Sequence, residues 1–169
     1  MKHVILETER LVLRKWSPAD AEAYMELYRD PEMFRWLGDG TGTPPTDIEP
    51  VRRRLGQKAV DSADVDLWAV CEKASGKVVG NCGLLATPES GGIELIYHIG
   101  RAHWGKGYAT EAAQACLNYG LGKLRIPRIV ALVYPENRGS VRVLEKIGMR
   151  PSGTTQAHGT LLRVFESTA

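Results

Sequence analysis

Apolar residues alternate with polar ones near the start of the chain and then change to helical spacing. In RLVLRKW, at residues 10–16, the two leucines share one face of an expected strand. Ser17-Pro18 has the residue types of a helix N-terminus, and apolar side chains recur three and four residues apart after it. Pro31 is expected to end this helix. The pattern therefore predicts a strand followed directly by a helix.

Residues 34–50 are rich in glycine, proline and threonine, yet they include two aromatic side chains. We expect a long ordered loop beside an apolar surface. A second helix is predicted from about Ile48 to Val60. Its three consecutive arginines, at positions 52–54, are interpreted as a solvated helix face in preference to an anion site.

Three strand-like runs follow, LWAVCEK, KVVGNCGLLA and GIELIYHIG, and their short connections predict an antiparallel meander. A helix from about Lys106 to Leu124 separates the third run from RIVALVY, and this order favours a right-handed crossover with parallel pairing. A helix at 140–147 and strand-like pieces near 154–156 and 161–165 complete the chain. We expect residues 1–169 to form a single α/β domain with a mixed sheet (α+β), in which an antiparallel N-terminal meander joins a parallel β-α-β core.

The composition is that of a globular protein, with 169 residues of which 43% are hydrophobic. No apolar run approaches the roughly 20 residues of a membrane span, and the N-terminus lacks a signal-peptide pattern, so a cytoplasmic protein without a membrane partner is expected. Three cysteines without CxxC spacing predict neither disulfides nor a metal site. A net charge of +2 is too small to indicate a nucleic-acid partner. Residues 101–169 hold ten basic and four acidic side chains, so an anionic ligand is expected there.

The segment WGKGYATEA, residues 104–112, lies between the third strand of the meander and the long helix. Its two glycines allow the backbone to approach a ligand, and the free N–H groups of a helix start favour phosphate oxygens. A P-loop would have Ser or Thr directly after its Gly-Lys, where this chain has Gly107. A dinucleotide-binding fingerprint would have a third glycine where this chain has Thr110. Neither motif fits the segment.

Four segments resemble, in order, the motifs of the GCN5-related N-acetyltransferases, the GNAT superfamily: ETERLVLRKWSPADAEAY, IELIYHI, HWGKGYATEA and PENRGSVRVLEKIGM. They are most similar to the branch typified by the ribosomal-protein N-terminal acetyltransferases RimJ and RimL. The resemblance implies the GNAT fold and acetyl-CoA as co-substrate, with no metal. One position departs from the superfamily pattern, which has Gln or Arg where this chain has Ala102.

The resemblance also implies where acetyl-CoA binds. The backbone of the glycine turn would cradle its pyrophosphate, and Lys106 would add positive charge. Asn137 would contact the pantetheine arm, although it also has the residue type of a helix N-cap. The implied cofactor-binding residues are Tyr97, His98, Ile99, Trp104, Gly105, Lys106, Gly107, Tyr108, Ala109, Thr110 and Asn137.

Acetyl transfer to an amine requires the neutral amine and benefits from an acid that protonates the departing thiolate. Glu94 lies in an otherwise apolar strand and is the candidate general base, because apolar neighbours raise the pKa of a carboxyl group. The alternative is a glutamate on a solvated strand face. The resemblance places Ser140 close to the thiol and makes it the candidate acid, with Tyr97 and Tyr108 as alternatives.

The acceptor pocket is expected outside the cofactor core. Phe34, Trp36 and Trp68 are candidates for an aromatic wall beside the thioester, although aromatic side chains of this size are also typical of a core. The resemblance implies a primary amine as acceptor, either on a small molecule or at a protein N-terminus. A catalytically silent acyl-CoA-binding sensor or interaction module is the alternative function. Both a monomer and a homodimer agree with the sequence.

Overall fold

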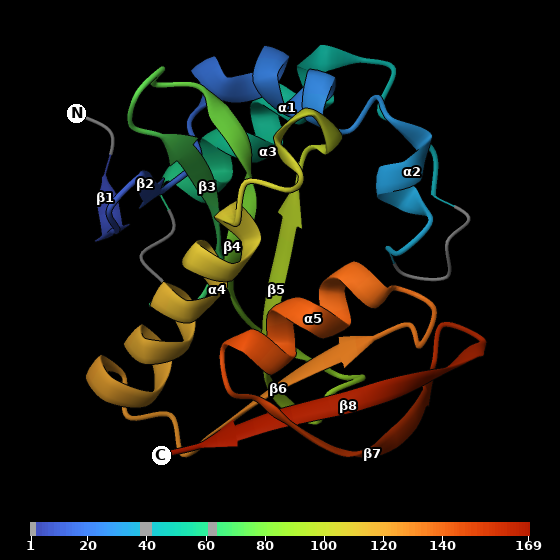
Figure 1. The fold of residues 1–169 in the computed structure, drawn as a ribbon. Coiled ribbons are helices and arrows are strands. Elements are labelled where there is room, and N and C mark those ends of the chain that lie inside the picture. The colour runs from blue at the N-terminus through green and yellow to red at the C-terminus, as the bar shows by residue number, and fades with distance from the viewer. Residues whose placement is uncertain (1–2, 38–41, 61–63) are drawn as a thin grey trace.

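A mixed sheet of eight strands forms the centre of the molecule (Figure 1). The computed structural model describes residues 3–37, 42–60 and 64–169. The strands lie in the order β1-β2-β3-β4-β5-β6-β8-β7. Their bounds are β1 (Val4–Glu7), β2 (Leu11–Arg14), β3 (Leu67–Glu72), β4 (Val78–Thr87), β5 (Gly92–Ile99), β6 (Arg128–Val133), β7 (Arg150–Ala157) and β8 (Thr160–Thr168).

Helices connect the strands and lie on both faces of the sheet (Figure 1). They are α1 (Ala21–Leu27), α2 (Pro31–Phe34), α3 (Ile48–Val60), α4 (Tyr108–Asn118) and α5 (Arg138–Lys146). A 3-10 turn, η1 (Pro18–Asp20), precedes α1, another, η2 (Arg101–His103), precedes α4, and a π-helical turn, η3 (Tyr119–Lys123), continues α4. None of the described helices combines the length and apolar character needed to span a lipid bilayer.

The predicted meander, the long helix and the parallel crossover are confirmed, and two segments differ from expectation. The first helix ends at Leu27, before Pro31, but Pro31 also begins α2. Proline fits the first turn of a helix, and the Asp30 carboxylate caps α2 by accepting a hydrogen bond from the Glu32 N–H. The segment expected to be a loop therefore begins within a helical turn. The sequence pattern also did not indicate β1, and β7 and β8 are longer than the strand-like pieces expected.

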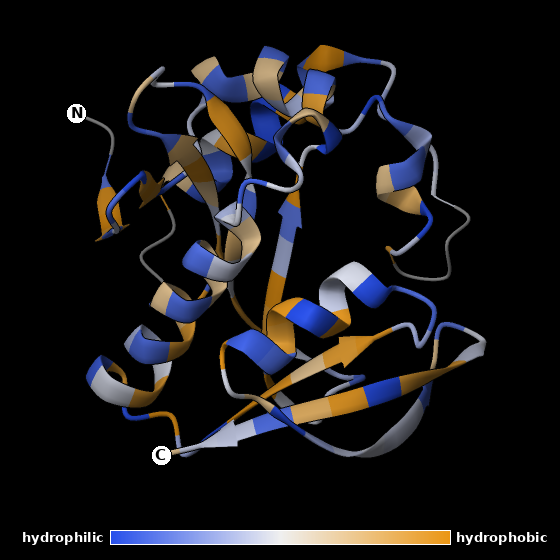
Figure 2. Cartoon of the chain, viewed as in Figure 1, coloured by the Kyte–Doolittle hydropathy of each residue, from blue (hydrophilic) through white to orange (hydrophobic). Residues whose placement is uncertain are grey.

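Alternate side chains of one strand face different helix layers, as the two-residue period of a strand requires. Ala69 and Cys71 of β3 pack with Leu55 of α3 on one face. Trp68 and Val70 point to the other face and belong to the larger core cluster, which includes α4 and α5. Strand β6 is orange over most of its length in Figure 2, and it is buried almost throughout. The two faces of the sheet thus carry separate cores.

The parallel strands β5 and β6 pair at their beginnings and then separate. Their register has two positions, Ile93 with Ile129 and Glu94 with Val130. On its other side, β5 pairs with β4 along its whole length, from Gly92 to Ile99. Within the described part of the chain, the second half of β5 therefore has backbone groups without a strand partner on the β6 side. This gap is the feature that positions the site described below.

A buried ion pair fixes the start of the first helix to the sheet. Arg14 at the end of β2 forms a bidentate ion pair with Asp20, with Nη–Oδ distances of 2.7 and 2.9 Å. Both side chains are nearly inaccessible, with exposed fractions of 6% and 5%. The same carboxylate accepts hydrogen bonds from the Ser17 N–H and hydroxyl, which completes its coordination in the interior.

Candidate active site

The glycine turn predicted to bind phosphate connects η2 to α4. Gly105 and Gly107 have φ angles of 76° and 81°, a left-handed conformation that glycine adopts readily. Gly107 is the N-cap of α4, and the first helical hydrogen bond runs from the Glu111 N–H to the Gly107 carbonyl. The N–H groups left without a helical partner are those of Tyr108, Ala109 and Thr110. The turn thus offers free donors at the positive end of a helix dipole, which suits a phosphate.

Arg10 braces this turn from a distant part of the chain. Its Nη1 donates to the Lys106 carbonyl at 2.8 Å, and its Nε donates to the Glu111 carboxylate at 2.7 Å. The guanidinium lies 4.8 Å from the centre of the Tyr108 ring, and the Thr8 hydroxyl donates to the same Glu111 carboxylate. These contacts use a carbonyl and side chains, so the N–H groups of the turn stay available.

Two further side chains near the turn have local partners. The Trp104 indole N–H donates to the Ile99 carbonyl at 2.6 Å, which ties the turn to the end of β5. Arg101, another cation at the edge of the turn, forms an ion pair with Asp30 at 2.6 Å. Lys106 makes no ion pair with a carboxylate among the described residues, although its charge helps to lower the pKa of Glu72, and its Nζ lies 5.8 Å from the Tyr108 ring centre. Lys106 is therefore the cation of the turn that is available to a ligand.

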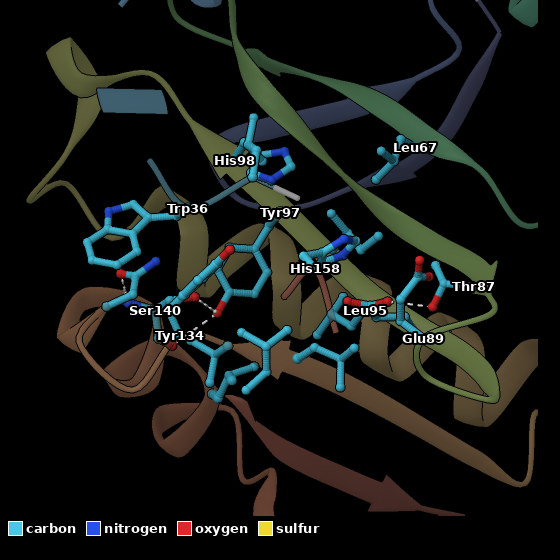
Figure 3. Close-up of a pocket in the computed structure, with 18 residues that line it drawn as sticks. Trp36, Leu67, Thr87, Glu89, Leu95, Tyr97, His98, Tyr134, Ser140 and His158 are labelled. Atoms are coloured by element: carbon cyan, nitrogen blue, oxygen red, sulfur yellow. Dashed lines mark hydrogen bonds between the residues drawn. The ribbon is translucent and has the colours of Figure 1, made fainter. Parts of the chain in front are cut away.

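A cavity of about 360 Å³ lies where β5 and β6 separate (Figure 3). Strand β5, the end of β6, the start of α5 and the β7–β8 turn contribute to its lining, together with the segment after α2. It brings together six of the residues expected to bind acetyl-CoA, the acceptor or the transferred proton: Trp36, Glu94, Tyr97, His98, Asn137 and Ser140.

Glu94 lies in this cavity and accepts a hydrogen bond from the Thr87 hydroxyl at 2.6 Å. Burial raises the pKa of Glu94 above its ordinary value, and the nearby charge of Glu89 acts in the same direction. Hydrogen bonds from Thr87 and from the Leu132 backbone, and the proximity of His158, oppose this shift without cancelling it. A carboxylate with a raised pKa is a stronger base than an exposed one, which suits proton abstraction.

Tyr97, Asn137 and Ser140 form a polar group at the start of α5. The Tyr97 hydroxyl lies 2.8 Å from the Ser140 hydroxyl oxygen and also donates to the Ser140 carbonyl at 3.0 Å. Asn137 is the N-cap of α5, because its side chain accepts a hydrogen bond from the Ser140 N–H at 3.2 Å. Burial raises the pKa of Tyr97, so its hydroxyl stays protonated at neutral pH. The group thus places two hydroxyls together in the cavity wall.

His98 belongs to a buried chain of hydrogen bonds. Its Nδ1 lies 3.0 Å from the Asn81 side-chain oxygen, and the Asn81 amide donates to the Tyr28 hydroxyl. With its amide nitrogen on Tyr28, Asn81 presents an acceptor to His98, so the His98 proton lies on Nδ1 and Nε2 is unprotonated. Burial lowers the pKa of His98 to about 4, so the ring is neutral at neutral pH.

The three aromatic candidates for the acceptor wall lie in three different places. Trp36 lines the cavity, with its ring centre 5.7 Å from that of Tyr134. Phe34 lines a separate pocket beside α1 and α3, near Tyr28. Trp68 is 1% exposed and packs edge-on against Tyr119 in the core, so the structure does not place it at either pocket. The parity of β3 directs Trp68 toward α4, which the sequence pattern alone did not reveal.

Residues 10–150 match a family model described as an acetyltransferase (GNAT) domain. The chain belongs to this GNAT family. It is 34% identical over 168 residues to an uncharacterized N-acetyltransferase, p20, of Bacillus licheniformis, covering 95% of this chain and 92% of that protein. The match spans nearly the whole of both chains, so the relationship includes the glycine turn and the cavity.

Solved GNAT structures share the fold. A GNAT-family acetyltransferase from Bacillus anthracis is 28% identical, with a TM-score of 0.76 and 95% of each chain covered. A putative ribosomal-protein-serine acetyltransferase from Vibrio cholerae is 19% identical, with a TM-score of 0.71 and 96% of each chain covered, and at that identity it shows the fold alone. These neighbours confirm the GNAT fold expected from the sequence.

GNAT proteins use acetyl-CoA, and the geometry fits that molecule. The free N–H groups after Gly107 suit a pyrophosphate, and the unpaired side of β5 suits the amides of a pantetheine arm. The cavity beyond is where a thioester at the end of that arm would lie. Among the described residues, no group of three or more His, Cys, Asp or Glu side chains is arranged to hold a metal ion.

Several residues of the site carried too weak a sequence signal to be singled out. Arg10 contacts residues about 100 positions away, and Asn81 acts through a buried chain. His158, in the cavity lining, has a φ of 53° and is followed by Gly159 with a φ of 72°. A His-Gly pair between two strand-like runs is the signal for such a two-residue hairpin turn.

Proposed function

We propose that the protein transfers the acetyl group of acetyl-CoA to a primary amine by direct attack in a ternary complex. The observation that carries this proposal is Glu94, a carboxylate of raised pKa in a cavity at the gap between β5 and β6. The cavity lies at this gap, and the glycine turn follows the end of β5 along the chain, so an extended molecule that binds at the turn and along β5 would lead toward the carboxylate. Holding both reactants in this way supplies much of the rate acceleration.

In the proposed reaction, Glu94 accepts a proton from the acceptor ammonium, directly or through water. The neutral nitrogen then forms a bond to the thioester carbon, the carbon–sulfur bond breaks, and the nitrogen loses its second proton. Through water, that proton replaces the one that Ser140 gives to the thiolate. Ser140 donates a proton to the departing thiolate, and Tyr97, whose hydroxyl lies 2.8 Å from that of Ser140, is the alternative donor. The products are an acetylated amine and CoA thiol, with one proton released.

The finer placement of the chain, in the RimJ/RimL-like branch, is supported by its four ordered motifs. That branch includes enzymes acting on protein N-termini, so the acceptor is either such a terminus or a small-molecule amine. The cavity is the feature that distinguishes these acceptors, and its lining is considered further below.

The decisive experiment combines calorimetric titration of acetyl-CoA with a thiol-release assay on an amine panel. We expect Glu94→Gln to lower kcat by about 100-fold or more while changing the Kd of acetyl-CoA less than about twofold. Retention of full activity would exclude Glu94 as the base. Absence of acetyl-CoA binding to folded wild-type protein would refute the proposed function, and binding without turnover of any amine would favour a silent acyl-CoA-binding module.

A further inference from the structure

The charged side chains that line the cavity are all acidic. Glu89, in the β4–β5 turn, and Glu94, in β5, both line it, and no lysine or arginine does so among the described residues. The other titratable groups facing the cavity are His98, His158 and the phenols of Tyr97 and Tyr134. The two carboxylates therefore favour a cation in the cavity, and a carboxylate on the acceptor has no lysine or arginine partner among the described residues of the lining.

The two carboxylates differ in what they contact. Glu94 is held by the Thr87 hydroxyl and lies deeper in the cavity. Glu89 is exposed and makes no hydrogen bond or ion pair with any residue in the described ranges. Elsewhere near the site, Glu111 and Asp30 are each paired with an arginine. Glu89 is thus a carboxylate in the cavity lining whose charge is available to a ligand.

The side chains that line the cavity differ between its two ends (Figure 3). Trp36, Tyr134 and Ser140 lie at one end of the cavity, and Thr87 and Glu89 lie at the other. The proposed reaction puts the thioester at the Ser140 end, and the hydrogen bond from Thr87 holds Glu94 toward the other end, so an acceptor that reacts beside Glu94 has the charge of Glu89 nearby. The volume of about 360 Å³ suits an extended small molecule.

We propose that the acceptor is a small amine with at least two ammonium groups, of which one reacts beside Glu94 and the other is held by Glu89. This inference rests on the proposed function, because it assigns the reacting amine to the base. The reacting ammonium loses one proton to Glu94, forms the bond to the acetyl carbon and then loses its second proton, whereas the other ammonium remains charged. Glu89 is then a specificity-determining residue that selects the acceptor and takes no part in bond formation.

Three acceptors of matched chain length test this assignment: 1,4-diaminobutane, butylamine and 4-aminobutyrate. They place an ammonium, a methyl group or a carboxylate at the end remote from the reacting amine. We expect kcat/KM for the diamine to exceed that for butylamine by about tenfold or more, as a charge-assisted hydrogen bond provides, with 4-aminobutyrate the poorest. Most of the difference should lie in KM.

The variant Glu89→Gln keeps the shape of the side chain and removes its charge. In this variant the preference for diamine over butylamine should fall to within about threefold. The matched control is Glu26→Gln, which removes an exposed carboxylate of α1 that lines neither cavity described here, and it should keep the wild-type preference.

The outcomes separate this inference from the function on which it rests. If wild-type protein binds acetyl-CoA but uses butylamine as well as the diamine, the inference is wrong and the proposed function stands. A much higher kcat/KM for a peptide N-terminus than for the diamine would likewise overturn it. If acetyl-CoA does not bind, both fail together. A preference that survives in Glu89→Gln would show that another group holds the second cation.

Discussion

Substitution of Gly105 by alanine tests whether the glycine turn is the cofactor-binding element. Gly105 has a φ of 76°, and a Cβ built there meets no atom within 4 Å, so Gly105→Ala introduces backbone strain without a clash. A left-handed conformation costs an alanine about 1–2 kcal/mol. That cost appears as lost stability if the free protein keeps this conformation, or as lost acetyl-CoA affinity if the free turn relaxes.

The loss of stability and the loss of acetyl-CoA affinity must therefore add up to this one strain energy. If all of it appears in binding, the Kd of acetyl-CoA rises by about fivefold to thirtyfold, because 1.4 kcal/mol is a factor of ten. If all of it appears in the free protein, Tm falls by about 2–8 °C for a domain of this size. Calorimetric titration and thermal unfolding of the same preparation give both quantities. Unchanged values of both would refute the idea that the turn is held left-handed.

Gly148→Ala is the matched control for this prediction. Gly148 follows the end of α5, has a φ of 82°, and also has no atom within 4 Å of a built Cβ. The strain is therefore comparable, but the position is outside the glycine turn and the cavity. It should lower Tm and leave the Kd of acetyl-CoA unchanged. An equal rise in Kd in both variants would show that the effect of Gly105→Ala is not local.

Three further variants test other contacts. Arg10→Ala removes the donor to the glycine turn, and we expect about a threefold to tenfold rise in the Kd of acetyl-CoA with less than about 1 kcal/mol loss of stability; calorimetry showing an unchanged Kd would contradict this. Asp20→Asn leaves Arg14 buried without its counter-charge and should lower the free energy of unfolding by about 3–5 kcal/mol in urea titrations. A loss below about 1 kcal/mol would show that the pair is dispensable. Thr87→Val removes a hydrogen bond that lowers the pKa of Glu94, so this pKa rises further. Because the base must be ionised, the acid limb of the kcat/KM profile should move to higher pH, and an unmoved limb would argue against Glu94 as the base.

The spacing of apolar residues and the positions of turn residues predicted most of the helices and strands. These local features predict the elements because they also stabilise them. Alternation of apolar and polar residues marked β2, strand-like apolar runs marked β3 to β6, and the glycine turn marked the start of α4. The motifs also contain five of the predicted site residues that line the cavity, namely Glu94, Tyr97, His98, Asn137 and Ser140. Residues close together in the chain were thus sufficient to predict the type of most elements and the segments that contribute to the site.

The remainder depends on contacts between distant segments. Whether Trp68 faced the cavity or the core was decided by the register of β3, which places it against Tyr119. The brace from Arg10 to Glu111 spans 101 positions and has no local signature. The cap of α5 is an intermediate case. Asn137 and Ser140 both have the residue type of a helix N-cap, and the structure shows that Asn137 is the cap.

The separation of β5 from β6 creates an unusual kind of edge. Unpaired strand backbone normally occurs at the outside of a sheet, where it invites pairing with other chains and aggregation. Here the unpaired side of β5 lies in the interior of the sheet order, with β4 on one side and the end of β6 facing it across the cavity. The unpaired N–H and C=O groups of this edge face a cavity of about 360 Å³ and not the outer edge of the sheet, so they are available to a molecule bound in the cavity. The fold thus places the unpaired backbone of β5 where a bound molecule can use it, and away from the outer edges at which strands of other proteins pair.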